Sequence, residues 1–379
     1  MDFSYTEEQQ MLQESVQKFV QKSYDFDARG KIIESEKGFS DEHWKLFAEL
    51  GWLTVPFSEE DGGFGGRAVD LMVLMEDFGK AMLVEPFLPT AVLAGGVVAA
   101  LGSAKQKGEL LPRLMQGELQ LALAHAEAGS RYNPAHVSVT AKVDGDNVVL
   151  NGSKAVVLNA PAADSILVVA RESGAENDNE GISVFLVSPQ SKGLVRHDYT
   201  TVDGRKAAEI ELNDVRVAAS ERLGEGGKAL PALVAVIDVA TLAVCAQAVG
   251  AMDSLLQKTV EYSKTRKQFG MPIGAFQALQ HRMVDMFTEC QLARSIVIMA
   301  ATTQDGNAAP EEKAKAISAA KSRVGKAIEK VGQEAVQIHG GIGVTDELDV
   351  GHLFKSVTAL ALLFGDADHH TRRFASFSA

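Results

Sequence analysis

The sequence has few cysteines and fewer basic residues than acidic ones. Its 379 residues include two cysteines, Cys245 and Cys290, both in apolar stretches of helical spacing. An even count alone does not predict a disulfide framework in a chain of this length. Lys and Arg number 37 against 50 Asp and Glu, for a formal net charge of −13, so no basic cluster is available to neutralise a phosphate backbone. Small disulfide-stapled domains and nucleic-acid-binding proteins are therefore disfavoured.

The sequence also lacks a recognisable targeting segment. The first ten residues, MDFSYTEEQQ, contain neither a basic region nor an apolar run, so we expect no secretory signal and a cytoplasmic protein. The most apolar stretch, Ala229 to Met252, is interrupted by Asp238 and Gln247. Polar residues at these positions are typical of a central helix in a bundle and not of a lipid-spanning helix. We predict no membrane association.

The hydrophobic period changes twice along the chain. Residues 1–118 are predicted to form an N-terminal α-helical domain, beginning with a capping box at Thr6-Glu-Glu-Gln9. Residues 119–222 contain β-branched runs such as Ile182–Val187, which predict a central β domain. Residues 223–379 return to the helical period and predict a C-terminal α-helical bundle. The predicted fold class is therefore α+β.

Five short strings occur in a fixed order along this layout. They are Glu49-Leu-Gly-Trp-Leu53 with the Gly-Gly-x-Gly loop after it, Asn151-Gly-Ser-Lys154, Arg266-Lys-Gln-Phe-Gly270, Phe276-Gln277, and Gln337-Ile-His-Gly-Gly-x-Gly343. In this order they resemble the acyl-CoA dehydrogenase family over nearly the whole chain. The resemblance implies the acyl-CoA dehydrogenase fold, FAD as the cofactor and an acyl-CoA thioester as the substrate. It also implies a dimer or a dimer of dimers in which each FAD lies across a subunit interface.

The C-terminal strings contain groups that suit an anionic cofactor. Arg266 offers a forked donor for a pyrophosphate, and Gly340 with Gly341 allows close approach of the backbone. The resemblance assigns FAD binding to Arg266, Gln268, Phe269, Gln277, Gln337, His339, Gly340, Gly341 and Ser130. In the family, most of these residues hold the FAD of the neighbouring subunit. The alternative is a loop and a helix end held by their own hydrogen bonds.

The chemistry of the family requires a carboxylate base, which removes an α proton while a hydride leaves the β carbon. A positioned base typically contributes a rate gain of about 10²–10⁴-fold. Counted without gaps from Gly340-Gly341, one family base position falls at Phe364; counted back from Ala248-Val-Gly250, the other falls at Ala240. We therefore predict no catalytic residue in this chain. Asp366 is the only nearby substitute, and a helix N-cap is its alternative interpretation.

The predicted ligand pocket has diverged at other positions too. Asp238 matches a family carboxylate that is expected to contact the substrate, and Thr241 stands where many members have an Arg that helps to bind CoA. The residues aligned with the family's flavin-lining segments are Leu123–Glu127 and Val156–Leu158. The only tryptophans are Trp44 and Trp52, so the β-domain tryptophan of the family is absent.

Several other residues are interpreted as structural. His125 lies in an apolar strand and is predicted to be a buried imidazole. Met283, Met286 and Phe287 are predicted to fill the core and not to line a cofactor. The adjacent His369 and His370 are interpreted as surface or interface groups, and no metal site is predicted. For these residues the sequence therefore predicts a structural role and no catalytic one.

The retained and diverged features are distributed unevenly, since the elements lent to a neighbour are kept and the base is missing. This pattern, with Glu85-Pro-Phe-Leu-Pro89 and Gly365-Asp-Ala-Asp-His-His370, resembles the small subunits of heteromeric bacterial acyl-CoA dehydrogenases of steroid side-chain and dicarboxylic acid degradation. The resemblance implies an α2β2 heterotetramer with a catalytic paralogue and an electron-transfer flavoprotein as acceptor. Two alternatives stay open: a self-sufficient homo-oligomeric dehydrogenase with a non-standard base, and a flavin-free acyl-CoA binding or scaffold protein.

Overall fold

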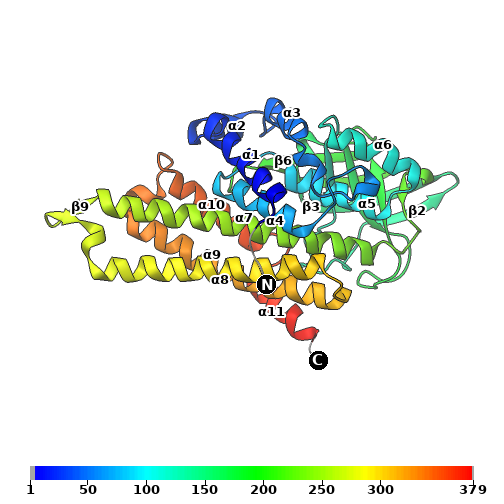
Figure 1. The fold of residues 1–379 in the computed structure, drawn as a ribbon. Helices are drawn as coiled ribbons and strands as arrows, with labels where there is room; N and C mark the ends of the chain where they lie inside the picture. Colours follow the sequence, from blue (N-terminus) through cyan, green and yellow to red (C-terminus); the bar gives the residue numbers. More distant parts are fainter. Residues whose placement is uncertain (1–4, 378–379) are drawn as a thin grey trace. The chain divides into compact units, whose positions relative to one another are not determined.

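The computed structural model describes residues 5–377, in which helices precede and follow a central sheet (Figure 1). The predicted α+β fold class and its helix–sheet–helix order are confirmed. In chain order, the α-helices are α1 (Glu7–Ser23), α2 (Phe26–Glu34), α3 (Asp41–Glu49), α4 (Ala68–Lys80), α5 (Gly96–Leu101), α6 (Ala104–Met115), α7 (Leu230–Thr265), α8 (Gln277–Asp305), α9 (Pro310–His339), α10 (Asp349–Leu362) and α11 (Ala367–Ser376).

The first helix begins at the capping box that the sequence predicts. The Thr6 hydroxyl accepts from the Gln9 backbone N–H at 3.3 Å, and the Gln9 side-chain oxygen accepts from the Thr6 N–H at 3.1 Å. The two bonds satisfy backbone donors that have no partner within the helix. The start of α1 is therefore fixed by local sequence.

The central strands form one mixed sheet in the order β6-β7-β3-β2-β4-β5-β8, and β1 pairs with β4 in parallel. Its core is made mostly of alanine and β-branched side chains, with leucines and Phe185 among them, and the β-branched runs of the sequence contribute to it. The strands are β1 (Leu121–Ala124), β2 (Thr140–Asp144), β3 (Asn147–Leu158), β4 (Ser165–Arg171), β5 (Ile182–Val187), β6 (Leu194–Thr200), β7 (Lys206–Ala218) and β8 (Arg222–Leu223).

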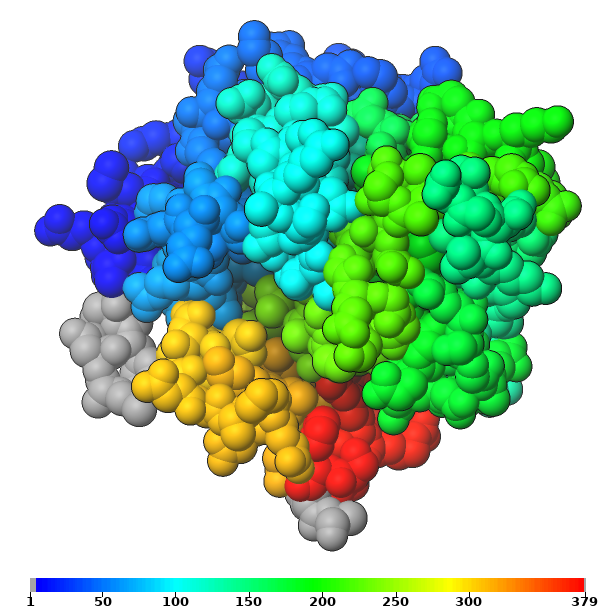
Figure 2. All heavy atoms as spheres, turned by 90° about the vertical axis from the view of Figure 1, so that its right-hand side faces the viewer, coloured from blue at the N-terminus to red at the C-terminus, as the bar shows by residue number. Residues whose placement is uncertain are grey.

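The chain divides into two compact units. The second unit comprises Ile32–Gly66 and Val84–Ala240, and the other described residues make up the first unit. In the second unit, the amide of Gln106 in α6 donates to the backbone oxygens of Ser220 and Arg222, both at 3.2 Å. Figure 2 shows the cyan atoms of this helical segment beside the green atoms of the sheet.

In the first unit, α4 and α7 approach each other at two glycines. A Cβ on Gly79 would lie 1.8 Å from the Gln247 oxygen, and a Cβ on Gly250 would lie 1.8 Å from the Glu76 oxygen. Glycine at both positions lets the two backbones touch. The helices α8 and α9 pack side by side in the same unit (Figure 1).

Two helical segments are long and apolar enough to be considered as membrane spans. The first is α7, and 72% of its most apolar window is buried inside the protein, as is typical of the core helix of a bundle. The second, Asp349–Ser376, is not one continuous helix, because it contains the non-helical linker between α10 and α11. The fold therefore explains both apolar segments: the first is a core helix, and the second is two helices joined by a linker.

One element was not predicted from the sequence. Residues Phe87–Gly95 form a buried π-helix, η3, directly after Glu85-Pro86. The Thr90 hydroxyl of η3 donates to the backbone oxygen of Leu121 at the start of β1, at 2.9 Å. Thr90 and the Gln120 amide also hydrogen-bond with Asn159, so a small polar network joins η3 to the sheet.

Candidate functional site

A short hairpin separates α7 from α8; it carries the predicted cofactor residues Gln268 and Phe269, and Arg266 directly precedes it. Strands β9 (Lys267–Gln268) and β10 (Met271–Pro272) pair antiparallel, and the turn residues Phe269 and Gly270 both have positive φ, at 54° and 82°. This two-residue turn is the kind that the twist of a hairpin favours. The Phe269 side chain is 90% exposed, and its ring forms a T-shaped pair with the ring of Phe276, with ring centroids 6.0 Å apart.

Arg266 is held through its backbone while its side chain is exposed. Its N–H donates to the Tyr262 oxygen at 2.8 Å, and its oxygen accepts from the Ile273 N–H at 2.8 Å. Gln268 in the hairpin and Gln277 at the start of α8 are exposed as well. The hairpin and the residues that flank it therefore present a guanidinium, two amides and an aromatic ring to the solvent, which suits an anionic, ring-bearing ligand.

The diglycine lies where α9 ends. Gly340 has φ +67° and caps α9, and a Cβ on either Gly340 or Gly341 would meet nothing within 4 Å. Open space on this side lets a ligand approach the backbone closely. Gln337, one turn earlier, is exposed. These three residues fit the role that the sequence predicts for them.

His339 has a different environment from the other predicted cofactor residues. Its side chain is buried, its Nδ1 lies 2.8 Å from the Ala335 oxygen, and its ring stacks on Tyr262 with centroids 4.4 Å apart. Burial lowers the pKa of His339. The Tyr262 hydroxyl donates to the His339 oxygen at 3.3 Å, so this contact joins the end of α7 to the end of α9. His339 thus brings the hairpin and the diglycine to one end of the helical bundle.

In the second unit, Ser130 is half-buried in a turn that follows a buried ion pair. The Ser130 N–H donates to the backbone oxygen of Glu127 at 3.0 Å. The Glu127 carboxylate accepts from Lys154 Nζ at 2.6 Å, from the Val139 N–H at 3.2 Å, and from both the N–H and the hydroxyl of Ser138. The Glu127 carboxylate, which was expected to belong to the flavin loop, is therefore hydrogen-bonded to other residues inside the protein.

Burial acts in opposite senses on the two charges of this pair. It raises the pKa of Glu127, but Lys154 and the hydrogen bonds outweigh burial, and the pKa lies below its usual value. Burial lowers the pKa of Lys154 to about 8. Both groups are charged at neutral pH. The Lys154 of the Asn151-Gly-Ser-Lys154 string thus holds the loop that carries Ser130.

The two segments that the resemblance aligns with the family's flavin-lining segments, Leu123–Glu127 and Val156–Leu158, differ in solvent exposure. Leu123 and Ala124 are buried, and burial lowers the pKa of His125 to about 4, so this imidazole is neutral in the folded protein. Val156 is 47% exposed and adopts φ +51° at a bulge in β3, a strained conformation for a β-branched residue. A backbone outlier of this kind is common at binding sites.

The two positions at which the sequence predicts the family base are occupied by Ala240 and Phe364. Ala240 and Thr241 are fully buried in α7, and Asp238 is 8% exposed. Phe364 lies in the linker between α10 and α11 with φ +60°. Its oxygen lies 3.0 Å from His370 Nε2. Asp238 is the acidic residue in the part of α7 that belongs to the second unit, and it is buried. Its predicted contact with the substrate stays a prediction.

Asp366 acts as a helix cap, as its alternative interpretation predicts. Its Oδ1 accepts from the His369 N–H at 2.7 Å at the start of α11. Below this linker, Lys321 Nζ donates to the oxygens of Leu360 and Ala361 at 2.5 and 3.0 Å. Burial lowers the pKa of Lys321 to about 8 and that of His370 to about 3. The linker is therefore held by buried structural contacts.

The interpretation of Phe287 as a core residue was wrong. Met286 is fully buried, but the neighbouring Phe287 is 53% exposed on α8. A helical apolar pattern shows which side of a helix avoids water, and that side can face the core or another chain. Cys245 and Cys290 are buried free thiols, and burial raises the pKa of each to about 12.

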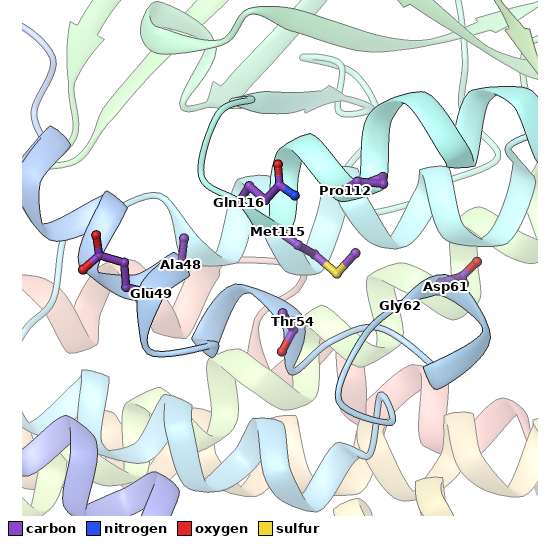
Figure 3. Close-up of a pocket in the computed structure, with 8 residues that line it drawn as sticks. All are labelled: Ala48, Glu49, Thr54, Asp61, Gly62, Pro112, Met115 and Gln116. Carbon is purple, nitrogen blue, oxygen red and sulfur yellow. The ribbon is translucent and has the colours of Figure 1, made fainter.

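A depression of about 570 Å³ lies in the second unit (Figure 3), and none of the predicted site residues lines it. It is lined by Ala48, Glu49, Thr54, Asp61, Gly62, Pro112, Met115 and Gln116. Asp61 pairs with Lys107 at 3.2 Å, and the remaining lining is mostly apolar. Among residues 5–377, no three His, Cys, Asp or Glu side chains are grouped so as to hold a metal ion.

Family models and known proteins match the chain over almost its full length. The acyl-CoA dehydrogenase N-terminal, middle and C-terminal domain models match residues 6–118, 122–215 and 230–377. The "Probable acyl-CoA dehydrogenase YngJ" of Bacillus subtilis is 30% identical over 373 residues, 97% of each chain. The "Caffeyl-CoA reductase-Etf complex subunit CarC" of Acetobacterium woodii is 28% identical over 95% of each chain. The structure of the ChsE4-ChsE5 complex from Mycobacterium tuberculosis matches with a TM-score of 0.88 and 27% identity, over 99% of this chain and 98% of that one.

Proposed function

Because this chain belongs to the acyl-CoA dehydrogenase family, a family of FAD-dependent oxidoreductases, we propose that it is the non-catalytic subunit of a heteromeric acyl-CoA dehydrogenase. In this role it completes the FAD site of a catalytic paralogue in an α2β2 heterotetramer. The assembly desaturates an acyl-CoA thioester in the cytoplasm, and FAD, when bound, accepts the hydride. One contrast carries the proposal: the hairpin and the diglycine expose cofactor-binding groups, whereas both base positions hold side chains that cannot accept a proton.

The residues present fit the FAD that the family binds. Arg266 is exposed and anchored through its backbone, so its guanidinium is available to a pyrophosphate. Gly340 and Gly341 leave open space for a ligand beside the backbone. Gln268, Gln277 and Gln337 offer amide donors, and Phe269 offers a ring for an adenine. On this reading the chain binds and orients the cofactor, and the paralogue's carboxylate moves the α proton.

The matched proteins support the heteromeric reading. ChsE4-ChsE5 is a complex of two named chains on this fold, and CarC is named as part of a complex with Etf. From the name of CarC we propose that the electron acceptor of this protein is an electron-transfer flavoprotein. The self-sufficient alternative needs a non-standard base, and the candidate that the sequence names for it, Asp366, already accepts a hydrogen bond from the first turn of α11 with one carboxylate oxygen.

Replacing Arg266 tests the contribution of this chain to the FAD site. We expect Arg266→Ala, co-expressed with the closest paralogue encoded nearby, to weaken FAD retention about 10- to 100-fold, because a hydrogen bond to a charged group contributes about 1.5–3 kcal/mol. The measurement is the flavin absorbance per heterotetramer after dialysis. Lys267→Ala, an exposed cation next in sequence, is the matched control. Equal flavin content in Arg266→Ala and wild type would refute the assignment.

The spectrum of the lone chain separates the alternatives. A colourless lone chain that forms a yellow heterotetramer with the paralogue supports the proposal. A yellow homo-oligomer that an acyl-CoA bleaches would show that the chain has its own active site. A chain that stays colourless with and without the paralogue, yet binds acyl-CoA, would identify a flavin-free binding protein.

A further inference from the structure

One buried arginine joins two loops of the second unit. Arg171 is the last residue of β4 and is 7% exposed. Its guanidinium donates six hydrogen bonds of 2.8 to 3.3 Å, and all six go to backbone oxygens. The acceptors lie before β2, at Ala135 and Val137, and after β4, at Ser173, Glu176, Asp178 and Glu180. A buried charge is costly unless it is hydrogen-bonded, so the two loops stabilise the charge that holds them together.

The guanidinium fork of Arg171 suits acceptors that arrive from different directions. Its Nε donates to the Val137 oxygen at 3.0 Å, its Nη1 to the Glu180 oxygen at 2.8 Å, and its Nη2 to the Ala135 oxygen at 2.8 Å. A guanidinium carries N–H groups on three nitrogens in a fixed plane, whereas a lysine donates from a single nitrogen. A lysine at position 171 would therefore leave about half of the six oxygens without their donor.

The first of the two loops carries the predicted cofactor residue Ser130. We define the Ser130 loop as residues 128–138. Next to Ser130, Arg131 and Tyr132 have φ values of 42° and 70°. Residues other than glycine are strained in this region, and they persist there only where the surrounding structure determines the conformation. The conformation around Ser130 therefore depends on the contacts that hold the loop in place.

The second loop lies against the Ser130 loop. We define the acidic turn as residues 172–181, which connect β4 to β5. The Glu176 oxygen of this turn accepts from the Val137 N–H at 2.9 Å and from Arg171 Nη2 at 3.1 Å. One carbonyl group is thus shared between the Ser130 loop and the guanidinium. The Ser130 loop, the acidic turn and Arg171 therefore form one hydrogen-bonded network.

We propose that Arg171 is a positioning residue of the cofactor site, which holds the Ser130 loop in the conformation that presents the Ser130 hydroxyl to a phosphate of FAD. Arg171 is buried and donates to backbone oxygens of the protein, so it acts through Ser130 and not by contact with the cofactor. A hydroxyl that donates to a phosphate must be held in one direction, because a hydrogen bond weakens steeply as its angle closes. This role deepens the proposed function and rests on it, because FAD is taken as the ligand of Ser130.

Retention of FAD by the assembly with the catalytic paralogue tests this role. We expect Arg171→Lys to weaken FAD retention about 10- to 100-fold, as Ser130→Ala does, because each variant loses one hydrogen bond to a charged group. The double variant Ser130→Ala/Arg171→Lys should match the single variants within about 2-fold, since both changes remove the same contact. Flavin absorbance after dialysis at a series of protein concentrations measures retention. The matched control is Arg216→Lys, at an exposed arginine of β7 that pairs with Asp144, and it should retain FAD as the wild type does.

Amide hydrogen exchange gives a second readout, which needs no flavin. In the wild-type chain we expect the Val137 and Glu172 N–H groups to be protected, because they donate to oxygens of the acidic turn. Arg171→Lys should speed their exchange by about 10-fold or more, while the N–H groups inside β4 and β5 stay protected. Free exchange at both positions in the wild type would overturn the role, since the network would then not be held. Loss of protection across the whole sheet in Arg171→Lys would also overturn it, since Arg171 would then support the fold as a whole.

The flavin measurements separate this role from the proposed function. A colourless wild-type assembly would refute the proposed function and the role of Arg171 with it. A yellow assembly in which Arg171→Lys retains FAD as the wild type does would refute the role of Arg171 alone. Losses that multiply in the double variant would refute it as well, because Arg171 would then act independently of Ser130.

Discussion

At the level of single residues, Lys154 and Glu127 are the clearest case of a buried charge that depends on its partner. The Lys154 side chain is fully buried and the Glu127 side chain is 4% exposed. We expect Lys154→Met to lower the free energy of unfolding by about 3–5 kcal/mol, because it leaves the carboxylate buried without its counter-charge. Denaturant unfolding followed by circular dichroism measures the change.

Two further variants make this experiment specific. Lys142→Met removes an exposed lysine from the neighbouring strand β2 and should change the free energy of unfolding by less than about 0.5 kcal/mol. The double variant Glu127→Gln/Lys154→Met should recover part of the loss, since no buried charge is left unpaired. A loss under 1 kcal/mol in Lys154→Met would show that the pair does not stabilise the fold.

The role of a residue could be predicted from the sequence where it depends on a residue close by in the chain. The N-cap interpretation of Asp366 was confirmed because the donor is the backbone three residues later. Lys154 was singled out by its string, but its partner Glu127 is 27 residues away and comes into reach only through the sheet. Phe287 was misplaced because an apolar helical pattern shows which side of a helix is apolar but does not show whether that side is packed against the core; the side chain is 53% exposed.

At the level of elements, the crossing of α4 and α7 tolerates no side chain. We expect Gly250→Ala to destabilise the protein by about 3 kcal/mol or more, since the new methyl group would overlap the Glu76 carbonyl of α4 and neither backbone can move freely. Thermal unfolding and soluble yield measure the effect. Gly108→Ala in α6 meets open space and should be neutral or stabilising by up to about 1 kcal/mol. A stable Gly250→Ala variant would contradict the close contact.

Elements were predictable where their signal is local and strong. The capping box fixed the start of α1, and the glycines after His339 marked the end of α9. No strand was predicted for the hairpin Lys267–Pro272, because two-residue strands leave no alternating pattern. The π-helix η3 escaped prediction because its nine residues are all buried, so they show no amphipathic period.

At the level of the whole molecule, the helix–sheet–helix order was predictable, but the compact units are not continuous in sequence. Helix α4 belongs with the C-terminal helices, where the Asp305 carboxylate at the end of α8 accepts from the Ala68 and Val69 N–H groups at 2.6 and 3.1 Å. A contact across more than 230 residues leaves no mark in local sequence. The boundaries predicted at residues 118 and 222 stay a prediction.

Each of the two units contains a histidine whose pKa is lowered, the buried His370 in the first unit and the half-buried His125 in the second. Burial lowers these pKa values to about 3 and about 4, from an ordinary value near 6.5. Below pH 6.5 the unfolded chain binds protons that the folded chain does not bind. Stability should therefore fall as the pH falls from 6.5 towards 4, by about 1.4 kcal/mol per pH unit for each group.

Variants at the two histidines assign this acid sensitivity to the units. His370→Gln and His125→Gln each remove one titrating group and keep an amide that can hydrogen-bond. We expect each variant to flatten the dependence of the free energy of unfolding on pH between 6.5 and 4, and the double variant to flatten it further. His281→Gln, at an exposed position of α8, should leave the slope unchanged. If the double variant kept the wild-type slope, other groups would account for the acid sensitivity and both imidazoles would have to be accessible to protons in the folded protein.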